Sequence, residues 1–382
     1  MPRRFACLRK PRLMLTALLP ILWIAACGEG PALAPTQADD LGDPMTLAAM
    51  GEKGRRSVTA DTPRGILGNS LPGGWRPFAD DSPWNTPIPA DAATHPSSDL
   101  VIGFMASEKG FIRASREYTI PVWIVDTERM EMPIVRSDRI YDDWDADRDG
   151  WSDVGAPLHP SMWWEATSDG HICVLDPARN LAWEMSRFDW LSDGTPTCTT
   201  FNVWDLTGAG HGDHNEGDRW QLRGGRGSGF PLIAGLVRPE EVRAGEIRHA
   251  LVFTFSEVRM SDEGWDMFVA PPACRGDGNM VGDQYPIEGM RLQLNPELTE
   301  SDFDEWGLTE EAKVMARALQ TYGMYLCDRG GDMAIQVQLL SDRPALHRSR
   351  WEDRLPGFFK SIEKIRTDQF RVVDQGEVVV KD

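Results

Sequence analysis

Apolar residues along this chain come in short runs, separated by glycine, proline, asparagine and aspartate, from Gly73 to about Leu340. Short runs bounded by such turn-forming residues are typical of strands in antiparallel sheets. The pattern predicts a mainly β fold, an antiparallel β-sandwich of the jelly-roll or lectin type with one or two short helices. The predicted strands are Thr119–Val125, Ser161–Ala166, His171–Asp176, Leu181–Arg187, Thr199–Trp204, Leu232–Leu236, Ala250–Phe255, Met290–Leu294, Met324–Cys327 and Met333–Leu339.

Helical periodicity is clearest over Thr309–Thr321. The first residue of this segment is a threonine that can cap a helix, and Glu310 and Glu311 follow it, where acids complement the helix dipole. Gly323 ends the predicted helix. A further helical turn is predicted at Pro239–Ala244.

The longest apolar run, Leu13 to Ala26, lies close to the start of the chain, behind five basic residues and in front of Cys27. The run is shorter than the roughly 20 residues that span a bilayer. Its layout is typical of a bacterial export signal ending in a lipobox. We therefore expect cleavage before Cys27, a lipid on its thiol and an extracytoplasmic location anchored to the cell envelope. Gly28 favours the outer membrane in a Gram-negative cell; a plain signal peptide and an uncleaved anchor helix are the alternatives.

Composition predicts four segments along the chain. Residues 1–26 form the lipoprotein signal peptide, and residues 27–72, rich in Gly, Pro, Ala, Thr and Asp, form a flexible tether. Residues 73–345 form the β-rich globular domain. Residues 346–382 are a charged C-terminal extension that packs on the domain.

The net charge of -19 excludes nucleic acid as an expected partner, because a strongly acidic protein repels a polyanion. The charge allows a cation, a neutral polymer or a basic partner, or simply a soluble surface. Beyond the signal peptide and Cys27, an even number of cysteines remains, which in an exported chain predicts disulfides. The favoured pairs are Cys173–Cys198 and Cys274–Cys327, and buried thiols are the alternative.

An acidic loop of the form D-x-D-x-D-G-x-x-D predicts calcium binding through Asp145, Asp147, Asp149 and Asp153. Ala156 occupies the position where a complete calcium loop has a bidentate glutamate. An acidic turn without an ion is the alternative. If calcium binds, we expect it to stabilise the loop rather than take part in chemistry.

A second polar loop holds His211 and His214 together with Asp213, Glu216 and Asp218. These side chains are possible ligands of Zn²⁺ or another transition metal. The spacing matches no standard zinc signature, so zinc is unlikely as a cofactor and a solvated loop is the leading interpretation.

The candidate catalytic residues are Glu165, His171, Glu184, Tyr322 and Asp328. Three of them lie on the predicted strands around Trp163 and Trp183, where aromatic rings can stack on sugars and paired carboxylates can cleave a glycosidic bond. His171 can instead act as a general base. The other two follow the predicted helix beside Arg329, a grouping that suits a polysaccharide lyase. Ordinary core and surface roles are the alternative for all five.

Several short phrases stand out along the chain: Ser82–Pro87 (SPWNTP), Asp169–His171 with Asp176–Pro177, Ser228–Leu232, Ala234–Glu241 (AGLVRPEE), His249–Phe253 (HALVF) and Ala318–Gly323 (ALQTYG). Together these phrases resemble an uncharacterised family of secreted bacterial proteins. The resemblance covers roughly Pro77 to Gly331 and implies one domain over that span, with no activity to transfer. The acidic loop and the histidine loop are additions to the pattern.

Taken together, the sequence predicts a lipid-anchored protein outside the cytoplasm that binds or cleaves a polysaccharide. As an enzyme it would be a polysaccharide lyase or a glycoside hydrolase. The alternatives are a non-enzymatic surface or envelope binding module and a metal-dependent hydrolase that uses His211 and His214.

Overall fold

The structure is a computed structural model of the 382-residue chain, and it describes residues 64–137, 149–212, 224–261, 267–376 and 379–381. The predicted signal peptide, Cys27 and nearly all of the predicted tether lie outside the described residues. None of the helices in the described ranges is long and apolar enough to cross a membrane.

The first large sheet has five strands in the order β1-β3-β5-β6-β9. Strands β3 and β5 are parallel, and the other neighbours are antiparallel. The strands are β1 (Ile66–Gly68), β3 (Val122–Val125), β5 (Ile172–Asp176), β6 (Leu181–Ser186) and β9 (Thr200–Asp205).

The second large sheet has six strands in the order β15-β12-β13-β10-β14-β2. The pairs β10–β13 and β14–β2 are parallel, and the remaining pairs are antiparallel. The strands are β2 (Arg113–Ala114), β10 (Leu251–Phe255), β12 (Arg291–Leu294), β13 (Met324–Arg329), β14 (Ala334–Ile335) and β15 (Phe370–Val372).

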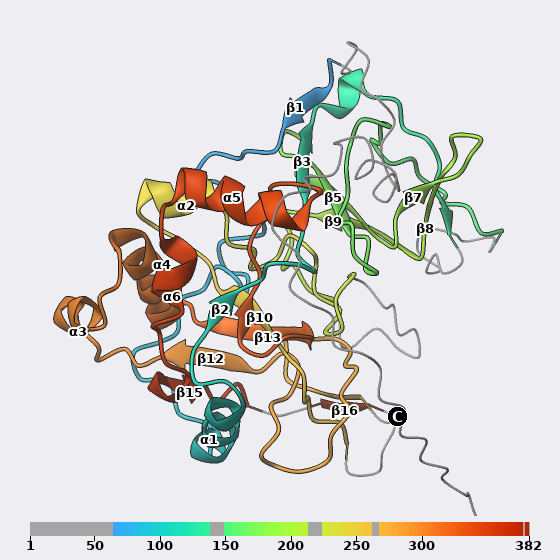
Figure 1. Cartoon of the computed structure of the whole chain (residues 1–382). Coiled ribbons are helices and arrows are strands. Elements are labelled where there is room, and N and C mark those ends of the chain that lie inside the picture. Colours follow the sequence, from blue (N-terminus) through green and yellow to red (C-terminus); the bar gives the residue numbers. More distant parts are fainter. Residues whose placement is uncertain (1–63, 138–148, 213–223, 262–266, 377–378, 382) are drawn as a thin grey trace, which may run out of the picture. The chain divides into compact units, whose positions relative to one another are not determined.

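Two small sheets complete the strands of the described ranges, β4-β8-β7 and β11-β16. Their strands are β4 (Arg136–Ser137), β7 (Asp189–Trp190), β8 (Pro196–Cys198), β11 (Met267–Val269) and β16 (Val379–Lys381). The α-helices are α1 (Ser98–Glu108), α2 (Pro239–Ala244), α3 (Glu300–Glu305), α4 (Glu310–Thr321), α5 (Pro344–Arg354) and α6 (Phe358–Ile362). Helices α2, α4, α5 and α6 gather on one side of the six-stranded sheet, and α1 lies beside β15 (Figure 1).

Alternate residues of the central strands enter different apolar clusters, because successive side chains of a strand point to opposite faces. Leu251 and Phe253 of β10 pack in a helix-side cluster, whereas Val252 packs in a cluster shared by the two large sheets. Cys173 of β5 enters that shared inter-sheet cluster, and Val174 enters a third cluster on the other face. The core is therefore built in layers, with each large sheet apolar on both faces.

The sheet-rich character with few helices is as the sequence predicts, but both large sheets are mixed rather than antiparallel. The physical reason is burial on both faces: every residue of β5 and of β10 is buried. A strand that is apolar on both faces shows no alternation, so its pattern does not tell a parallel from an antiparallel neighbour.

The two predicted helices are confirmed as α4 and α2. Thr309 precedes α4, and its hydroxyl accepts a hydrogen bond from the Ala312 amide at 3.3 Å. Gly323 follows the helix with a φ of 68°, which favours glycine. The predictions of strands at Ser161–Ala166 and Leu232–Leu236 are wrong, since both segments form turns and irregular backbone.

Candidate functional site

A cavity of about 620 Å³ opens where strands β10 and β13 end. Thr254 of β10 and Asp328 of β13 both line it. The two strands are parallel, so their carboxyl ends reach the same edge of the sheet. Ligand pockets in proteins commonly have volumes of about 300–1,000 Å³, and this cavity falls in that range.

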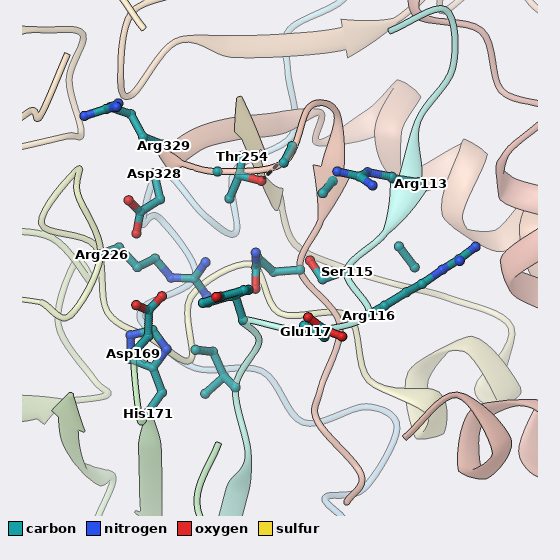
Figure 2. A pocket seen from close by; sticks show the side chains of 17 residues that line it. Arg113, Ser115, Arg116, Glu117, Asp169, His171, Arg226, Thr254, Asp328 and Arg329 are labelled. Carbon is teal, nitrogen blue, oxygen red and sulfur yellow. Dashed lines mark hydrogen bonds between the residues drawn. The ribbon is translucent and has the colours of Figure 1, made fainter. Parts of the chain in front are cut away.

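Charged side chains face each other across the cavity (Figure 2). On one side lie Asp169, His171, Arg226, Asp328 and Arg329, and on the other side Arg113 and Arg116. With Glu117, the lining contains four arginines and three carboxylates. This balance is unusual for a chain with a net charge of -19, and it favours an anionic ligand.

Arg226 is the most deeply buried cation of the lining, with only 3% of the residue exposed. Its Nη2 donates to the carbonyl oxygen of Leu232 at 2.7 Å and its Nη1 donates to the Cys327 sulfur at 3.1 Å. Burial raises the pKa of the Cys327 thiol to about 12, so this neighbour is neutral. The guanidinium is thus held by neutral acceptors, and it forms no ion pair within 4.0 Å among the described residues.

A glycine-rich turn brings Arg226 inside. Gly224 has a φ of 88°, and a Cβ there would meet the carbonyl oxygens of Gly229 and Phe230 at 2.3 Å. The amide of Ser228 donates to the carbonyl oxygen of Cys327 at 3.0 Å, which fixes the turn against β13. The sequence GGRGSG therefore serves backbone packing around a buried arginine.

His171 is buried beside Arg226 and is neutral. Burial, assisted by the positive charge of Arg226, lowers its pKa to about 3, and a hydrogen bond to the Gly225 backbone only partly opposes this. Its Nδ1 has no hydrogen-bond partner among the described residues. His171 lines the cavity, and a neutral imidazole with an unused, buried nitrogen is available there to accept a proton at neutral pH.

The turn before β5 places Asp169 and His171 together at the cavity. Gly170 between them has a φ of 52°, and a Cβ there would lie 2.9 Å from the Cα of Arg187. The carbonyl oxygen of Gly170 accepts from the Phe188 amide at 3.0 Å. The turn is therefore pinned to the segment after β6, and glycine is needed for this contact.

Both aspartates of the cavity hold their protons more tightly than usual. Burial raises the pKa of Asp169, against the hydrogen bond from Ser168 and the charge of Arg187. Burial and the nearby Asp277 raise the pKa of Asp328 to about 7. Carboxyl groups shifted in this direction are suited to donate a proton near neutral pH.

A bulge in β13 directs the consecutive side chains of Cys327 and Asp328 toward the same glycine-rich turn around Arg226. The pairing of β10 with β13 shifts by one residue, from Phe253–Leu326 to Thr254–Asp328, with Cys327 between. In a regular strand Cys327 and Asp328 would point to opposite faces. Here Cys327 contacts Arg226, and a Cβ on Gly227 would lie 2.8 Å from Asp328 Oδ1.

Of the five predicted catalytic residues, His171 and Asp328 line the cavity, whereas Glu165, Glu184 and Tyr322 do not. Glu165 is buried next to the turn, its amide donating to the carbonyl oxygen of His171 at 2.9 Å. Burial raises the pKa of Glu165 as well. Tyr322 ends α4 and packs at the edge of the inter-sheet cluster.

Glu184 is fully buried and holds backbone rather than a ligand. It accepts hydrogen bonds from the amides of Leu232 and Ile233 at 2.7 and 2.9 Å. Burial nevertheless raises the pKa of Glu184 to about 7. These two hydrogen bonds and the positive charge of Arg226 only partly oppose that rise. These contacts explain why Leu232–Leu236 is a turn rather than the predicted strand.

The structure contains no disulfide among Cys173, Cys198, Cys274 and Cys327, and all four side chains are buried. Cys173 and Cys198 belong to different apolar clusters, the inter-sheet cluster and the third cluster, which explains why this predicted pair does not form. The backbone of Ser228 accepts from the Cys274 amide and donates to the Cys327 carbonyl, so this residue separates the second predicted pair.

The two predicted metal loops are described only in part. Asp145, Asp147, His214 and the acids that follow it lie outside the described residues. Asp149 and Asp153 are exposed, and Asp149 Oδ1 accepts from the Trp151 amide at 2.8 Å. His211 Nδ1 lies 2.8 Å from the carbonyl oxygen of Gly212. The calcium and zinc predictions for these loops stay predictions.

The described residues contain a different group of possible metal ligands, Asp277, Glu288 and Asp328, whose oxygens lie within 4.8 Å of one another. Sequence reasoning also missed Arg226 and Asp169. Arg226 stands in a glycine-rich stretch that resembles no phosphate loop, and Asp169 directly precedes the Gly-His pair. The glycines on either side of Arg226 were the available signal, because they indicate a close backbone approach.

Comparison of the chain with protein-family models, with curated proteins and with solved structures found no match.

Proposed function

We propose that this protein is carbohydrate-active and that its cavity binds, and cleaves, a polysaccharide carrying acidic groups. The observation that carries the proposal is the neutral His171, with an unused ring nitrogen, beside the buried Arg226, which forms no ion pair among the described residues. Arginine recognises a carboxylate by paired hydrogen bonds, and a low-dielectric site strengthens that attraction.

The chemistry that this pair supports best is β-elimination on a uronate sugar. Arg226 binds the sugar carboxylate and stabilises the charge that develops on it. His171 takes the proton from the carbon next to that carboxylate. The glycosidic C–O bond breaks as the C=C bond forms, and the leaving oxygen takes a proton from the Tyr118 hydroxyl. Tyr118 lines the cavity, and its backbone φ is 54°.

Hydrolysis is the second candidate, and the carboxyl groups of Asp169 and Asp328 favour it. Each has a raised pKa, and Asp328 reaches about 7. A protonated carboxyl donates to the leaving oxygen while an ionised partner activates water or attacks the sugar. Binding without cleavage, as a surface module would show, is the third outcome of the test below.

The cellular setting of this proposal rests on the sequence. We propose that Cys27 carries a lipid, that the protein is anchored outside the cytoplasm and that the domain meets polymers at the envelope. The shared inter-sheet cluster supports describing the two large sheets as a sandwich of the jelly-roll or lectin kind. Calcium at Asp145–Asp153 remains part of the proposal.

The test is a panel of uronate, sulfated and neutral polysaccharides, with products analysed by mass and by ultraviolet absorbance. Unsaturated products from uronate polymers support the lyase, and new reducing ends without absorbance support the hydrolase. Binding without products supports the module. Absence of both binding and products across the panel overturns the proposal.

Two variants locate the activity in the cavity. His171→Ala is expected to reduce turnover about 10²–10⁴-fold, the usual contribution of general-base catalysis. Arg226→Lys is expected to weaken binding of acidic more than of neutral polymers, because lysine lacks the paired donors. His95→Ala and Arg350→Lys, at positions outside the cavity, are the matched controls. Equal losses in the controls would remove the cavity from the proposal.

A further inference from the structure

Three carboxylates from separate parts of the chain converge next to Gly227. Asp277 comes from the loop after Cys274, Glu288 from the segment before β12, and Asp328 from β13. Their ligand oxygens lie within 4.8 Å of one another. Oxygen ligands of one calcium ion lie about 2.3–2.6 Å from it, so two of them are at most about 5 Å apart.

Glu288 points an unused oxygen into this group although its residue is completely buried, at 0% exposure. Its Oε2 accepts a hydrogen bond from the Asp277 amide at 3.1 Å. Its Oε1 has no hydrogen-bond partner among the described residues. Leaving a buried polar group without a hydrogen-bond partner costs on the order of 1–3 kcal/mol of folding free energy, and a charged group costs more. Such an atom therefore indicates a ligand that binds there.

Gly227 leaves the space in which the three carboxylates meet. A Cβ at this position would lie 2.6 Å from Glu288 Oε1, 2.8 Å from Asp328 Oδ1 and 3.0 Å from Asp277 Oδ1. The φ of Gly227 is outside the left-handed region, so its backbone conformation does not by itself require glycine. What requires glycine here is the approach of the three oxygens.

The positive side chains nearby are engaged with backbone carbonyls. Arg275 Nε donates to the carbonyl oxygen of Gly227 at 3.0 Å, and Arg226 donates to carbonyls and to Cys327. Among the described residues, no ion pair includes Asp277, Glu288 or Asp328. The protein therefore relieves the mutual repulsion of the three carboxylates only in part, through the charges of Arg226 and Arg275 near Asp328.

We propose that Asp277, Glu288 and Asp328 bind one calcium ion. All three ligands are oxygens, which hard divalent cations prefer over the nitrogen and sulfur ligands of zinc. Calcium accepts irregular geometry and both oxygens of a carboxylate, whereas magnesium demands a near-octahedral arrangement. Asp277 is exposed, so water can complete the coordination on that side.

A bound ion here joins the loop of Asp277, the segment of Glu288 and strand β13. It also keeps Asp328 ionised and fixed at the edge of the cavity that holds Arg226. The site goes beyond the proposed function, because ion binding is measured without any polysaccharide. Its success or failure is therefore distinguishable from that of the carbohydrate hypothesis.

The test uses the full chain, freed of metal with a chelator and titrated with calcium chloride. Calorimetry should detect calcium binding, and the Tm should rise by about 5 °C or more at saturation, since a ligand that binds only the folded state stabilises it. Magnesium and manganese are titrated in parallel. No binding of calcium to the wild-type chain, or a larger Tm rise with magnesium, overturns the proposal.

Three variants separate this cluster from the acidic loop at Asp145–Asp153. Glu288→Gln should lose most of the calcium response while keeping the Tm of the metal-free protein at or above that of the wild type. Gly227→Ala keeps every carboxylate but places a methyl among them, and should also lose the response. Asp147→Asn should retain it. A calcium response that persists in Glu288→Gln and disappears in Asp147→Asn assigns the ion to the loop and overturns the proposal.

An exposed acidic residue serves as the matched control for loss of charge. Asp81→Asn removes one negative charge outside the cluster. It should show the wild-type calcium affinity and Tm shift. Equal weakening in Asp81→Asn and Glu288→Gln would mean that calcium responds to net charge alone, against a built site.

Discussion

Two buried charged clusters in this protein are opposite in character. The first joins Arg238, Glu241 and His249, all less than 5% exposed. Arg238 Nη2 donates to Glu241 Oε2 at 2.7 Å, and His249 Nε2 lies 3.2 Å from the same oxygen. The second is the carboxylate cluster of Asp277, Glu288 and Asp328, which contains no cation.

The pKa of the central glutamate moves in opposite directions in the two clusters. Burial alone would raise the pKa of Glu241, but the charges and hydrogen bonds of Arg238 and His249 lower it. Burial raises the pKa of Glu288 well above its usual value, and the charges of Asp277 and Asp328 raise it further. Burial is common to both, so the neighbours decide the sign.

The difference distinguishes a structural ion pair from a site that lacks a counter-charge. The Arg238 cluster pairs its charges within the fold, although Arg238 Nη1 has no hydrogen-bond partner among the described residues, and none of its three members lines the cavity of Arg226. The carboxylate cluster leaves charge and an oxygen unsatisfied, and Asp328 lies at the cavity. Groups with pKa values perturbed in this way concentrate at functional sites.

The largest expected effect on stability comes from breaking the cluster of Arg238, Glu241 and His249, called the paired cluster below. Arg238→Met leaves Glu241 buried with one partner fewer, and should lower the free energy of unfolding by about 3–5 kcal/mol. Urea denaturation measures it, since urea does not screen charges. The control Arg350→Met, at an exposed position of α5, should change it by less than about 0.5 kcal/mol. A loss below about 1 kcal/mol in Arg238→Met would mean that the pair contributes little.

The next largest effect is the pH dependence of the free energy of unfolding, which is opposite for the two clusters. Because the folded-state pKa of Asp328 is about 7 and that of Glu288 is also raised, the folded protein binds these protons more tightly than the unfolded chain. Their contribution is present below about pH 4 and is lost as the pH rises through 7, roughly 2–4 kcal/mol without metal. Glu241 acts in the opposite sense: its stabilisation is present above its unfolded pKa and is lost as the pH falls through the lowered folded value.

Urea denaturation of the chelated protein between pH 3 and pH 8 measures both trends. Asp328→Asn should flatten the decline between pH 4 and pH 7 and leave the acid side unchanged. A decline that is equally steep in Asp328→Asn would contradict the assignment to this cluster.

In the carboxylate cluster, a single substitution should raise the free energy of unfolding, whereas substitutions in the paired cluster lower it. Glu288→Gln removes one of three repelling charges, and its amide can donate to the remaining carboxylates. Without metal at pH 8, the free energy of unfolding should rise by about 1–2 kcal/mol. Destabilisation as large as that of Arg238→Met would show that the charge of Glu288 is compensated after all.

The smallest effect is expected from the histidine of the paired cluster. His249→Gln keeps one donor for Glu241 while losing the ring, and should cost about 1 kcal/mol by urea denaturation. Loss of stability beyond that of Arg238→Met would place the main counter-charge of Glu241 on the histidine.

Local signals in the sequence sufficed for parts of the fold. Thr309 and Gly323 delimit α4, because capping and a left-handed glycine act within a few residues. The direction of β13 relative to β10 depends on a crossover through other elements, which no local pattern carries. Helices α5 and α6 were absent from the prediction, since burial of Trp351 against the core overrides a highly charged segment.

The site was predictable in half of its parts. His171 and Asp328 are polar residues at strand ends, and their type alone suggests chemistry. Arg226 and Glu288 gain their importance from contacts across long distances in sequence, such as the separation of 101 positions between Arg226 and Cys327. The bulge that turns Asp328 toward Gly227 depends on pairing register, which is a property of two strands together.

The pairing of β2 with β14 has a consequence for biosynthesis. Ser115 of the cavity wall donates to the carbonyl oxygen of Ile335, 220 residues later. Contacts so distant form slowly, because the loop between them must close first. A growing chain therefore has neither cavity nor converged carboxylates until more than three hundred residues have been made. Partly made or clipped chains present these acids singly, so tight calcium binding would report that synthesis and folding are complete.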